Sequence, residues 1–114
     1  MKKILILLLL MVSTNVFAEL TVLKYDNMSK AEKDSYRMYI NGLVRGAQWM
    51  MIVFGNESNK LYCQPDKLAL NTDNNVDILK RRINKIKSLN YDLSKSYIEM
   101  EIIEGLIDTF PCKK

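Results

Sequence analysis

The residues with the most chemical potential in this chain of 114 residues are its two cysteines, Cys63 and Cys112, and the chain contains no histidine. Without histidine it lacks the commonest general base, the Ser-His-Asp and Cys-His arrangements and most zinc sites. The cysteines do not form a Cys-x-x-Cys motif, and no glycine-rich phosphate loop is present. We therefore expect a protein that is not an enzyme and that holds neither a metal ion nor a cofactor.

Three carboxylates near Cys112 could still do acid/base chemistry: Glu101, Glu104 and Asp108. Paired carboxylates act as general acid and base only where a pocket shifts their pKa values. Their spacing of three and four residues places all three on one side of a helix. We interpret them as an acidic strip that faces water.

The first 18 residues have the pattern of a secretion signal. Lys2 and Lys3 form a positive start, residues 4–12 form an apolar run, and Val16-Phe17-Ala18 supplies a small-x-small cleavage site. Polar residues at positions 13–15 interrupt the apolar run well before the length of about 20 residues that a membrane span needs. We expect residues 1–18 to be cleaved, which leaves a mature chain that is not held in the membrane. The Lys-Lys start and compact leucine-rich run are typical of bacteria and predict a periplasmic protein.

Residues 19–114 are long enough for one small helical domain. Loss of Lys2 and Lys3 brings the formal net charge of +4 close to zero, so a nucleic acid partner is not indicated. The core of so small a domain is marginal, and an oxidising compartment favours a covalent staple. We predict a Cys63–Cys112 disulfide, whose loop of about 48 residues would stabilise the fold by about 4 kcal/mol.

The first long helix is predicted from Ser29 to Phe54, ending at Gly55-Asn56. Ser29 and Glu32 have the spacing of a capping box, in which each side chain binds the backbone amide of the other residue. Apolar residues cover most of the circumference of this helix and leave only a narrow polar strip. We therefore expect it to be packed on two sides, at the centre of the domain or of a dimer.

Two glycines, Gly42 and Gly46, lie inside this predicted helix, and Trp49 extends the same face. A glycine in a helix costs about 0.5–1 kcal/mol relative to alanine. We interpret the pair as a site where another backbone approaches closely. The neighbour would belong either to the same chain or to the second copy of a homodimer.

A second helix is predicted to end near Leu89, and the turn-like residues 71–75 are expected to supply its caps. It has a narrow apolar stripe, and Arg81, Arg82 and Lys85 cluster on the opposite side. We interpret this basic cluster first as a solvated face and second as a docking surface for an acidic partner.

A third helix is predicted to be capped by Asp92 or Ser94 and to end at Pro111. The chain shows almost no strand pattern. The predicted fold is all-α, a small disulfide-stapled helical bundle of three main helices plus short connecting helical turns.

The motifs occur in a particular order: a signal sequence, Tyr39-Ile40-Asn41-Gly42 with Gly46 one turn later, Cys63-Gln64-Pro65, a middle helix, and an apolar helix that closes on Phe110-Pro111-Cys112. This order, spanning roughly residues 35–112, resembles the Tai-type immunity family of bacterial type VI secretion systems. The resemblance implies a periplasmic all-α homodimer. Such a protein binds a peptidoglycan amidase injected by a neighbouring cell and blocks its active-site cleft.

Only structural positions are carried over from the resemblance: Gly42, Gly46, Cys63, Pro65, Pro111 and Cys112. For contact with the toxin we select the loop of Asn90, Tyr91 and Asp92, because an aromatic side chain between polar groups can fill a cleft. The basic cluster is the second choice. The Asn- and Asp-rich stretch from residue 61 to 76 departs from the family pattern, so a toxin other than an amidase stays open.

A rival hypothesis from another class is a small periplasmic acid-stress holdase chaperone, which would also be helical, exported and disulfide-stapled. With no histidine, its acid switch would depend on Glu101, Glu104 and Asp108. A minor structural protein of the envelope is a third hypothesis.

Overall fold

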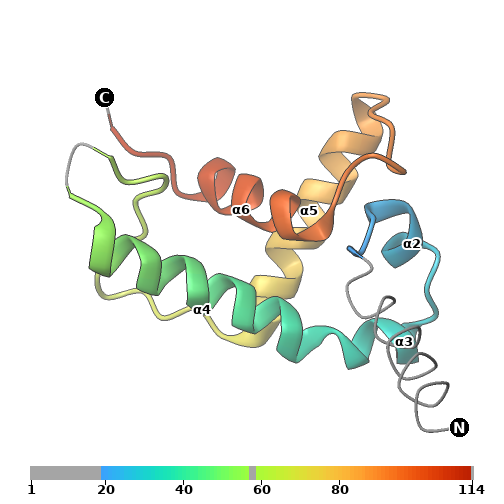
Figure 1. The fold of residues 1–114 in the computed structure, drawn as a ribbon, viewed down its shortest axis with the longest axis horizontal. Coiled ribbons are helices and arrows are strands. Elements are labelled where there is room, and N and C mark those ends of the chain that lie inside the picture. Colours follow the sequence, from blue (N-terminus) through green and yellow to red (C-terminus); the bar gives the residue numbers. More distant parts are fainter. Residues whose placement is uncertain (1–18, 57–58, 114) are drawn as a thin grey trace, which may run out of the picture.

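The computed structural model describes residues 19–56 and 59–113, and these are mostly helical (Figure 1). Within this part no strand is formed, only one isolated bridge between Thr21 and Tyr97. The prediction of an all-α fold with three main helices and short helical turns is confirmed, while the predicted signal sequence, residues 1–18, lies outside the described residues. In chain order the helices are α2 (Val22–Asp26), α3 (Lys30–Ser35), α4 (Arg37–Phe54), α5 (Thr72–Ser88) and α6 (Ile98–Thr109).

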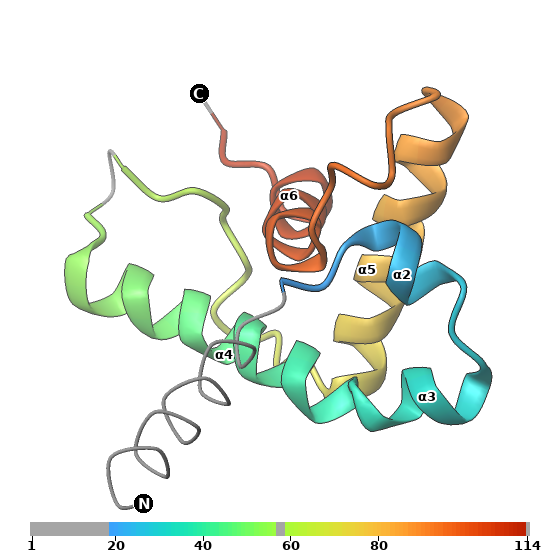
Figure 2. The same ribbon diagram turned by 45° about the vertical axis from the view of Figure 1, so that its right-hand side comes forward.

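The core lies where α5 and α6 pack against each other and against α4 (Figures 1 and 2). The segment before α2 closes it, because the Val22 amide donates to the Ser96 carbonyl (2.8 Å) and the Ile98 amide donates to the Leu20 carbonyl (3.1 Å). The buried apolar side chains are Leu20, Val22, Tyr25, Ile40, Val44, Tyr62, Ile78, Leu79, Ile83, Ile86, Ile98, Ile102 and Leu106.

The predicted first helix has the expected ends but is interrupted at Tyr36. The Ser29 hydroxyl accepts from the Glu32 amide (3.2 Å), and the Glu32 carboxylate accepts from the Ser29 amide (2.7 Å), so the capping box is confirmed. At Tyr36 the amide bonds three residues back, to Lys33, and the ring packs edge-on against Tyr25. This tighter turn separates α3 from α4, and the prediction of one continuous helix is wrong there.

The stretch 71–75 supplies the cap of α5, as predicted, whereas α6 begins later than predicted. Asn71 caps α5, since its side chain accepts from the Asn74 amide (2.9 Å) and its own amide donates to the Asn74 side chain (3.1 Å). The predicted turn at 71–75 is therefore mostly helix. Helix α6 starts after Tyr97, so neither Asp92 nor Ser94 caps it. Its end before Pro111 is confirmed.

The N-terminal half of α4 supplies its fully buried residues, while Ala47 and Met51 of the other half pack against the core partly buried. Ile40 and Val44 are buried, the Tyr39 hydroxyl donates to Glu99 on α6 (2.6 Å), and the Asn75 side chain on α5 donates to Asn41 (3.0 Å). The glutamate carboxylate raises the pKa of Tyr39 to about 12. The C-terminal end of α4 runs out past α6 (Figure 1). The predicted position of this helix at the centre of the domain is therefore wrong for the single chain.

The Cys63–Cys112 disulfide is confirmed, with Cα atoms 4.9 Å apart. Beside it, the Cys63 amide donates to the Phe110 carbonyl (2.7 Å). The staple thus ties the connector between α4 and α5, residues 55–71, to the end of α6. Within residues 19–56 and 59–113, no helix combines the length and apolar character that crossing a membrane requires.

Candidate functional site

The loop selected from the sequence, Asn90-Tyr91-Asp92, follows the C-terminal end of α5 (Figures 1 and 2). Asn90 adopts a left-handed conformation (φ 57°), which asparagine tolerates better than most residues. The Tyr91 amide donates to the Ile86 carbonyl (3.0 Å), while the Tyr91 side chain remains 55% exposed. The chain therefore turns sharply after α5 and presents an aromatic ring to solvent.

Asp92 holds the second half of this loop. Its carboxylate accepts from the Ser94 hydroxyl (2.6 Å) and the Ser94 amide (3.0 Å), and its carbonyl accepts from the Lys95 amide (3.1 Å). The Ser94 hydroxyl and amide lower the pKa of Asp92. These bonds fix the backbone beside Tyr91, so the ring is displayed from an ordered loop.

The basic cluster is divided between the interior and the surface. Arg82 donates to Glu101 (2.7 Å) and to Asp108 (2.9 Å) on α6, and its side chain is only 12% exposed. Lys85 also donates to Asp108 (2.8 Å), and these cations, Lys85 first, hold the pKa of Asp108 below its usual range. Arg81 points outward and pairs with Asp77 on its own helix.

Two sequence-based interpretations fail at this ion cluster of Arg82, Glu101 and Asp108. The solvated face does not include Arg82, because Ile78 beside it is also buried and the two pack toward α6. The acidic strip does not wholly face water, because Glu101 is buried and paired. Arg82 therefore has no free surface to offer a partner, whereas Arg81 and Lys85 are both at least half exposed.

Gly42 and Gly46 are not close-packing sites within the part of the chain that the structure describes. In residues 19–56 and 59–113, no atom outside their own helix lies within 4 Å of the position that a Cβ would take at either residue. The close approach occurs instead at Gly105 on α6, where a Cβ would lie 2.9 Å from Ile78 Cγ2 and 3.3 Å from the Ile78 carbonyl. The sequence reasoning missed Gly105, although a glycine inside the apolar third helix was a signal of the same kind.

Gly42 and Gly46 belong to an exposed face of α4. Trp49 is 65% exposed and Val53 is 64% exposed, on the side of the helix turned away from Ile40 and Val44. A monomeric protein rarely leaves so much apolar surface together. We call this strip the outer face; it comprises Met38, Gly42, Gly46, Trp49 and Val53.

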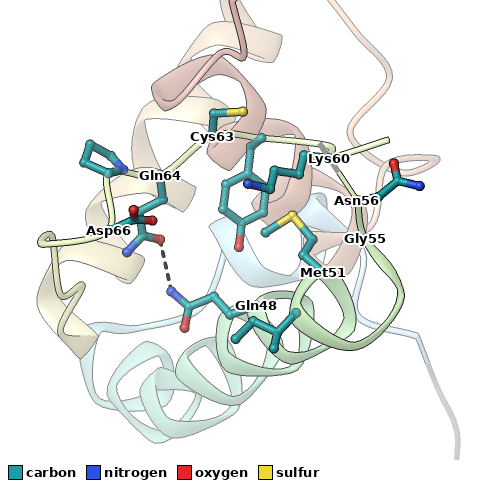
Figure 3. Close-up of a pocket in the computed structure, with 11 residues that line it drawn as sticks. Gln48, Met51, Gly55, Asn56, Lys60, Cys63, Gln64 and Asp66 are labelled. Carbon is teal, nitrogen blue, oxygen red and sulfur yellow. Dashed lines mark hydrogen bonds between the residues drawn. The ribbon is translucent and has the colours of Figure 1, made fainter. Parts of the chain in front are cut away.

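A cavity of about 520 Å³ opens between the C-terminal half of α4 and the connector (Figure 3). The Gln48 side chain donates to the Gln64 side chain across it (3.0 Å), and Gln64 in turn donates to the Leu68 carbonyl. We call it the connector cavity; its lining includes Gln48, Met51 and Ile52 from α4 and Tyr62, Gln64 and Pro65 from the connector.

A second cavity of about 400 Å³ borders the first and is mostly apolar, with Phe54, Leu61 and Ile103 in its wall. Met51 and Tyr62 line both. Tyr62 is 1% exposed, and its hydroxyl has no hydrogen-bond partner among the described residues. Burial also raises its pKa, so the hydroxyl stays protonated. Nothing in the spacing of the sequence indicated this tyrosine, although it directly precedes the tethered Cys63.

The described residues, 19–56 and 59–113, contain no group of three or more cysteine or acidic side chains placed to hold a metal ion. The features that they offer for binding other molecules are an ordered loop, an apolar helix face and a cavity lined in part by amides. No family model matches the chain, and neither a curated protein nor a solved structure shows significant similarity to it.

Proposed function

We propose that this chain is a periplasmic immunity protein that binds a type VI secretion toxin, a peptidoglycan amidase, and blocks its active-site cleft. The observation that carries the proposal is the Asn90-Tyr91-Asp92 loop, which displays an exposed aromatic ring from a hydrogen-bonded backbone. An ordered loop loses little conformational freedom when it enters a cleft, which favours tight binding. The Cys63–Cys112 disulfide and the signal pattern of residues 1–18 support export to the periplasm.

A survival assay tests this function. Each secreted hydrolase encoded beside the gene is expressed in the periplasm of a sensitive host, with and without this chain. We expect survival only when the chain carries its signal sequence, together with a stable complex and loss of hydrolase activity in vitro. Failure to protect against every linked hydrolase would contradict the proposal.

The loop is tested in the same complex. Replacing Tyr91 and Asp92 together with alanine removes the ring and the bonds that order the backbone, so we expect affinity to fall at least about tenfold, or about 1.4 kcal/mol. Lys80→Ala, an exposed change on α5, is the matched control and leaves affinity unchanged. Unchanged affinity in the double variant would show that another surface holds the toxin.

We further propose that the outer face of α4 forms a homodimer. Gly42 and Gly46 would allow the second copy of α4 to approach closely, and the exposed Trp49 would be covered. Val53→Asp places a charge in this interface, and we expect it to shift the sedimentation equilibrium to the monomer. A wild-type chain that is monomeric at high concentration would refute the dimer.

One observation favours the acid-stress holdase as a second candidate. The ion cluster that joins α5 to α6 requires ionised carboxylates at Glu101 and Asp108, so acid would loosen this contact and expose apolar surface. A holdase would keep an acid-denatured client protein from aggregating at about pH 3 but not at about pH 7. Absence of this activity at both pH values would eliminate the candidate.

A further inference from the structure

The connector cavity has the size and lining of a binding site. Its volume of about 520 Å³ lies within the range of about 300–1,000 Å³ usual for ligand pockets. The walls combine apolar side chains, Met51 and Ile52, with the amides of Gln48 and Gln64. Figure 3 shows these amide groups joined across the cavity, with Met51 on the same helix as Gln48.

Gln48 is suited to bind a peptide group. Its side chain carries two N–H donors and one carbonyl acceptor, and among the described residues it uses only one donor, toward Gln64. The carbonyl oxygen and the second N–H are therefore left to form the paired bonds that a backbone amide can return. Because Gln64 is itself anchored to the Leu68 carbonyl, the orientation of the Gln48 amide is fixed.

Tyr62 places a buried hydroxyl group beside the connector cavity. Its buried hydroxyl lacks a partner among residues 19–56 and 59–113, a condition that destabilises the free protein. Met51 borders the same two cavities, and a methionine side chain has enough rotamer freedom to move aside. Movement of Met51 would make room beside the Tyr62 ring for an inserted side chain.

The rim indicates how large the occupant is. Ile52, which lines the connector cavity, is 68% exposed, and Phe54 and Leu61, which line the second cavity beside it, are 70% and 61% exposed. A small molecule inside the connector cavity would leave these side chains in water, whereas a polypeptide laid across both cavities would cover them. Such clustered exposed apolar residues around a pocket are typical of protein-binding sites.

We propose that the connector cavity binds an extended polypeptide segment of a partner protein, which inserts one large apolar side chain beside Met51 and pairs a peptide group with Gln48. The site goes beyond the function proposed above, because it lies at the opposite end of the molecule from the Asn90-Tyr91-Asp92 loop (Figures 1 and 2). It is also distinct from the outer face, since Gln48, Met51 and Ile52 lie on another side of α4.

The test uses a phage-displayed library of random linear peptides, selected on the full oxidised chain. We expect a consensus with a large apolar anchor residue. The synthesised consensus peptide is then titrated by fluorescence anisotropy against wild type and variants. Ile52→Asp, which puts a charge on the rim, weakens binding at least about tenfold, and Gln48→Ala weakens it about three- to tenfold through loss of the paired hydrogen bonds.

Met100→Asp is the matched control, because Met100 on α6 is 59% exposed, close to the 68% of Ile52, but lines neither cavity. It leaves peptide affinity unchanged, and circular dichroism shows all three variants to be folded. Failure to enrich a consensus, equal losses from the two aspartate variants, or full affinity in Gln48→Ala would each overturn the proposal. No toxin is used, so this site and the immunity function can fail independently.

Discussion

The α5–α6 pair and the C-terminal half of α4 are both rich in apolar residues, yet they differ in what covers those residues. Between α5 and α6 a glycine brings the helices together, Ile102 is fully buried, and the ion cluster closes the edge. Along α4 from Gln48 to Phe54 most apolar side chains remain exposed. The difference shows that hydrophobic content alone does not distinguish the core from an exposed apolar surface.

The comparison also separates stability from recognition. Side chains between α5 and α6 stabilise the domain, and a partner cannot reach them. The exposed side chains on the distal half of α4, unlike Met51, which packs against the core, contribute little to folding of the single chain and are accessible to other molecules. The following predictions test this division, beginning with the largest effect.

The most direct test replaces one isoleucine in each of the two regions with alanine. Ile102→Ala removes a fully buried side chain and is expected to lower the free energy of unfolding by about 4 kcal/mol, as cavity-forming substitutions do. Ile52→Ala, at a side chain 68% exposed, is expected to change it by less than about 0.5 kcal/mol. Urea denaturation at low protein concentration measures both. Equal losses in the free energy of unfolding would show that the two regions contribute equally to stability.

The ion cluster is tested by removing its buried acid. Glu101→Ala leaves the largely buried Arg82 guanidinium with Asp108 as its remaining partner. We therefore expect the free energy of unfolding to fall by about 3 kcal/mol. Glu104→Ala, one turn away on the same helix, is the control and costs well under about 1 kcal/mol. If both variants unfolded at the same urea concentration, the cluster would not contribute to the scaffold.

Two glycine substitutions are expected to have opposite signs, one between α5 and α6 and one on the outer face of α4. Gly105→Val forces atoms against the Ile78 side chain and carbonyl, and we expect it to destabilise the fold by about 2 kcal/mol. Gly42→Ala meets no neighbour among the described residues and improves helix propensity, so the monomer should gain up to about 1 kcal/mol. Thermal unfolding at low concentration reports both. A destabilised Gly42→Ala monomer would place an unrecognised contact at that glycine.

The smallest effect is a dependence on pH. Lys85 and Arg82 lower the pKa of Asp108 in the folded state, so this carboxylate stabilises the fold fully above its unfolded pKa of about 4. That contribution is lost as pH falls through the lower folded pKa. Asp108→Asn should therefore reduce the acid sensitivity of the unfolding temperature. If the pH dependence of the unfolding temperature were unchanged, solvent would screen the interaction of Asp108 with Lys85 and Arg82 completely.

Local signals in the sequence predicted the ends of helices and the staple well. Ser29 and Glu32 cap α3 as their spacing indicates, Gly55 follows the last residue of α4, and Cys63 pairs with Cys112. Each of these depends on a few neighbouring residues or, for the cysteines, on there being a single pair. No comparable local signal marked the break at Tyr36, which depends on packing against Tyr25.

Contacts between helices could not be read from periodicity. Arg82 and Glu101 each look like solvent-facing residues on their own helix, and only the crossing of α5 over α6 buries them together. Likewise the connector cavity depends on the path that brings Tyr62 back beside α4. The loop at Tyr91 was predictable, because polar turn residues around an aromatic already mark an exposed loop in the sequence.

The disulfide also gives the molecule a covalent ring. Residues 63–112, which include α5, the Tyr91 loop and α6, are closed into a ring by the disulfide. In contrast, α2, α3 and α4 are joined to this ring covalently only through the connector. A single backbone cut in the Tyr91 loop would therefore leave α5 and α6 covalently joined through the Cys63–Cys112 bond. A cut between α4 and Cys63 would instead leave α4 held to the ring by non-covalent contacts alone, so the two ends of the molecule differ in how well they tolerate a backbone cut.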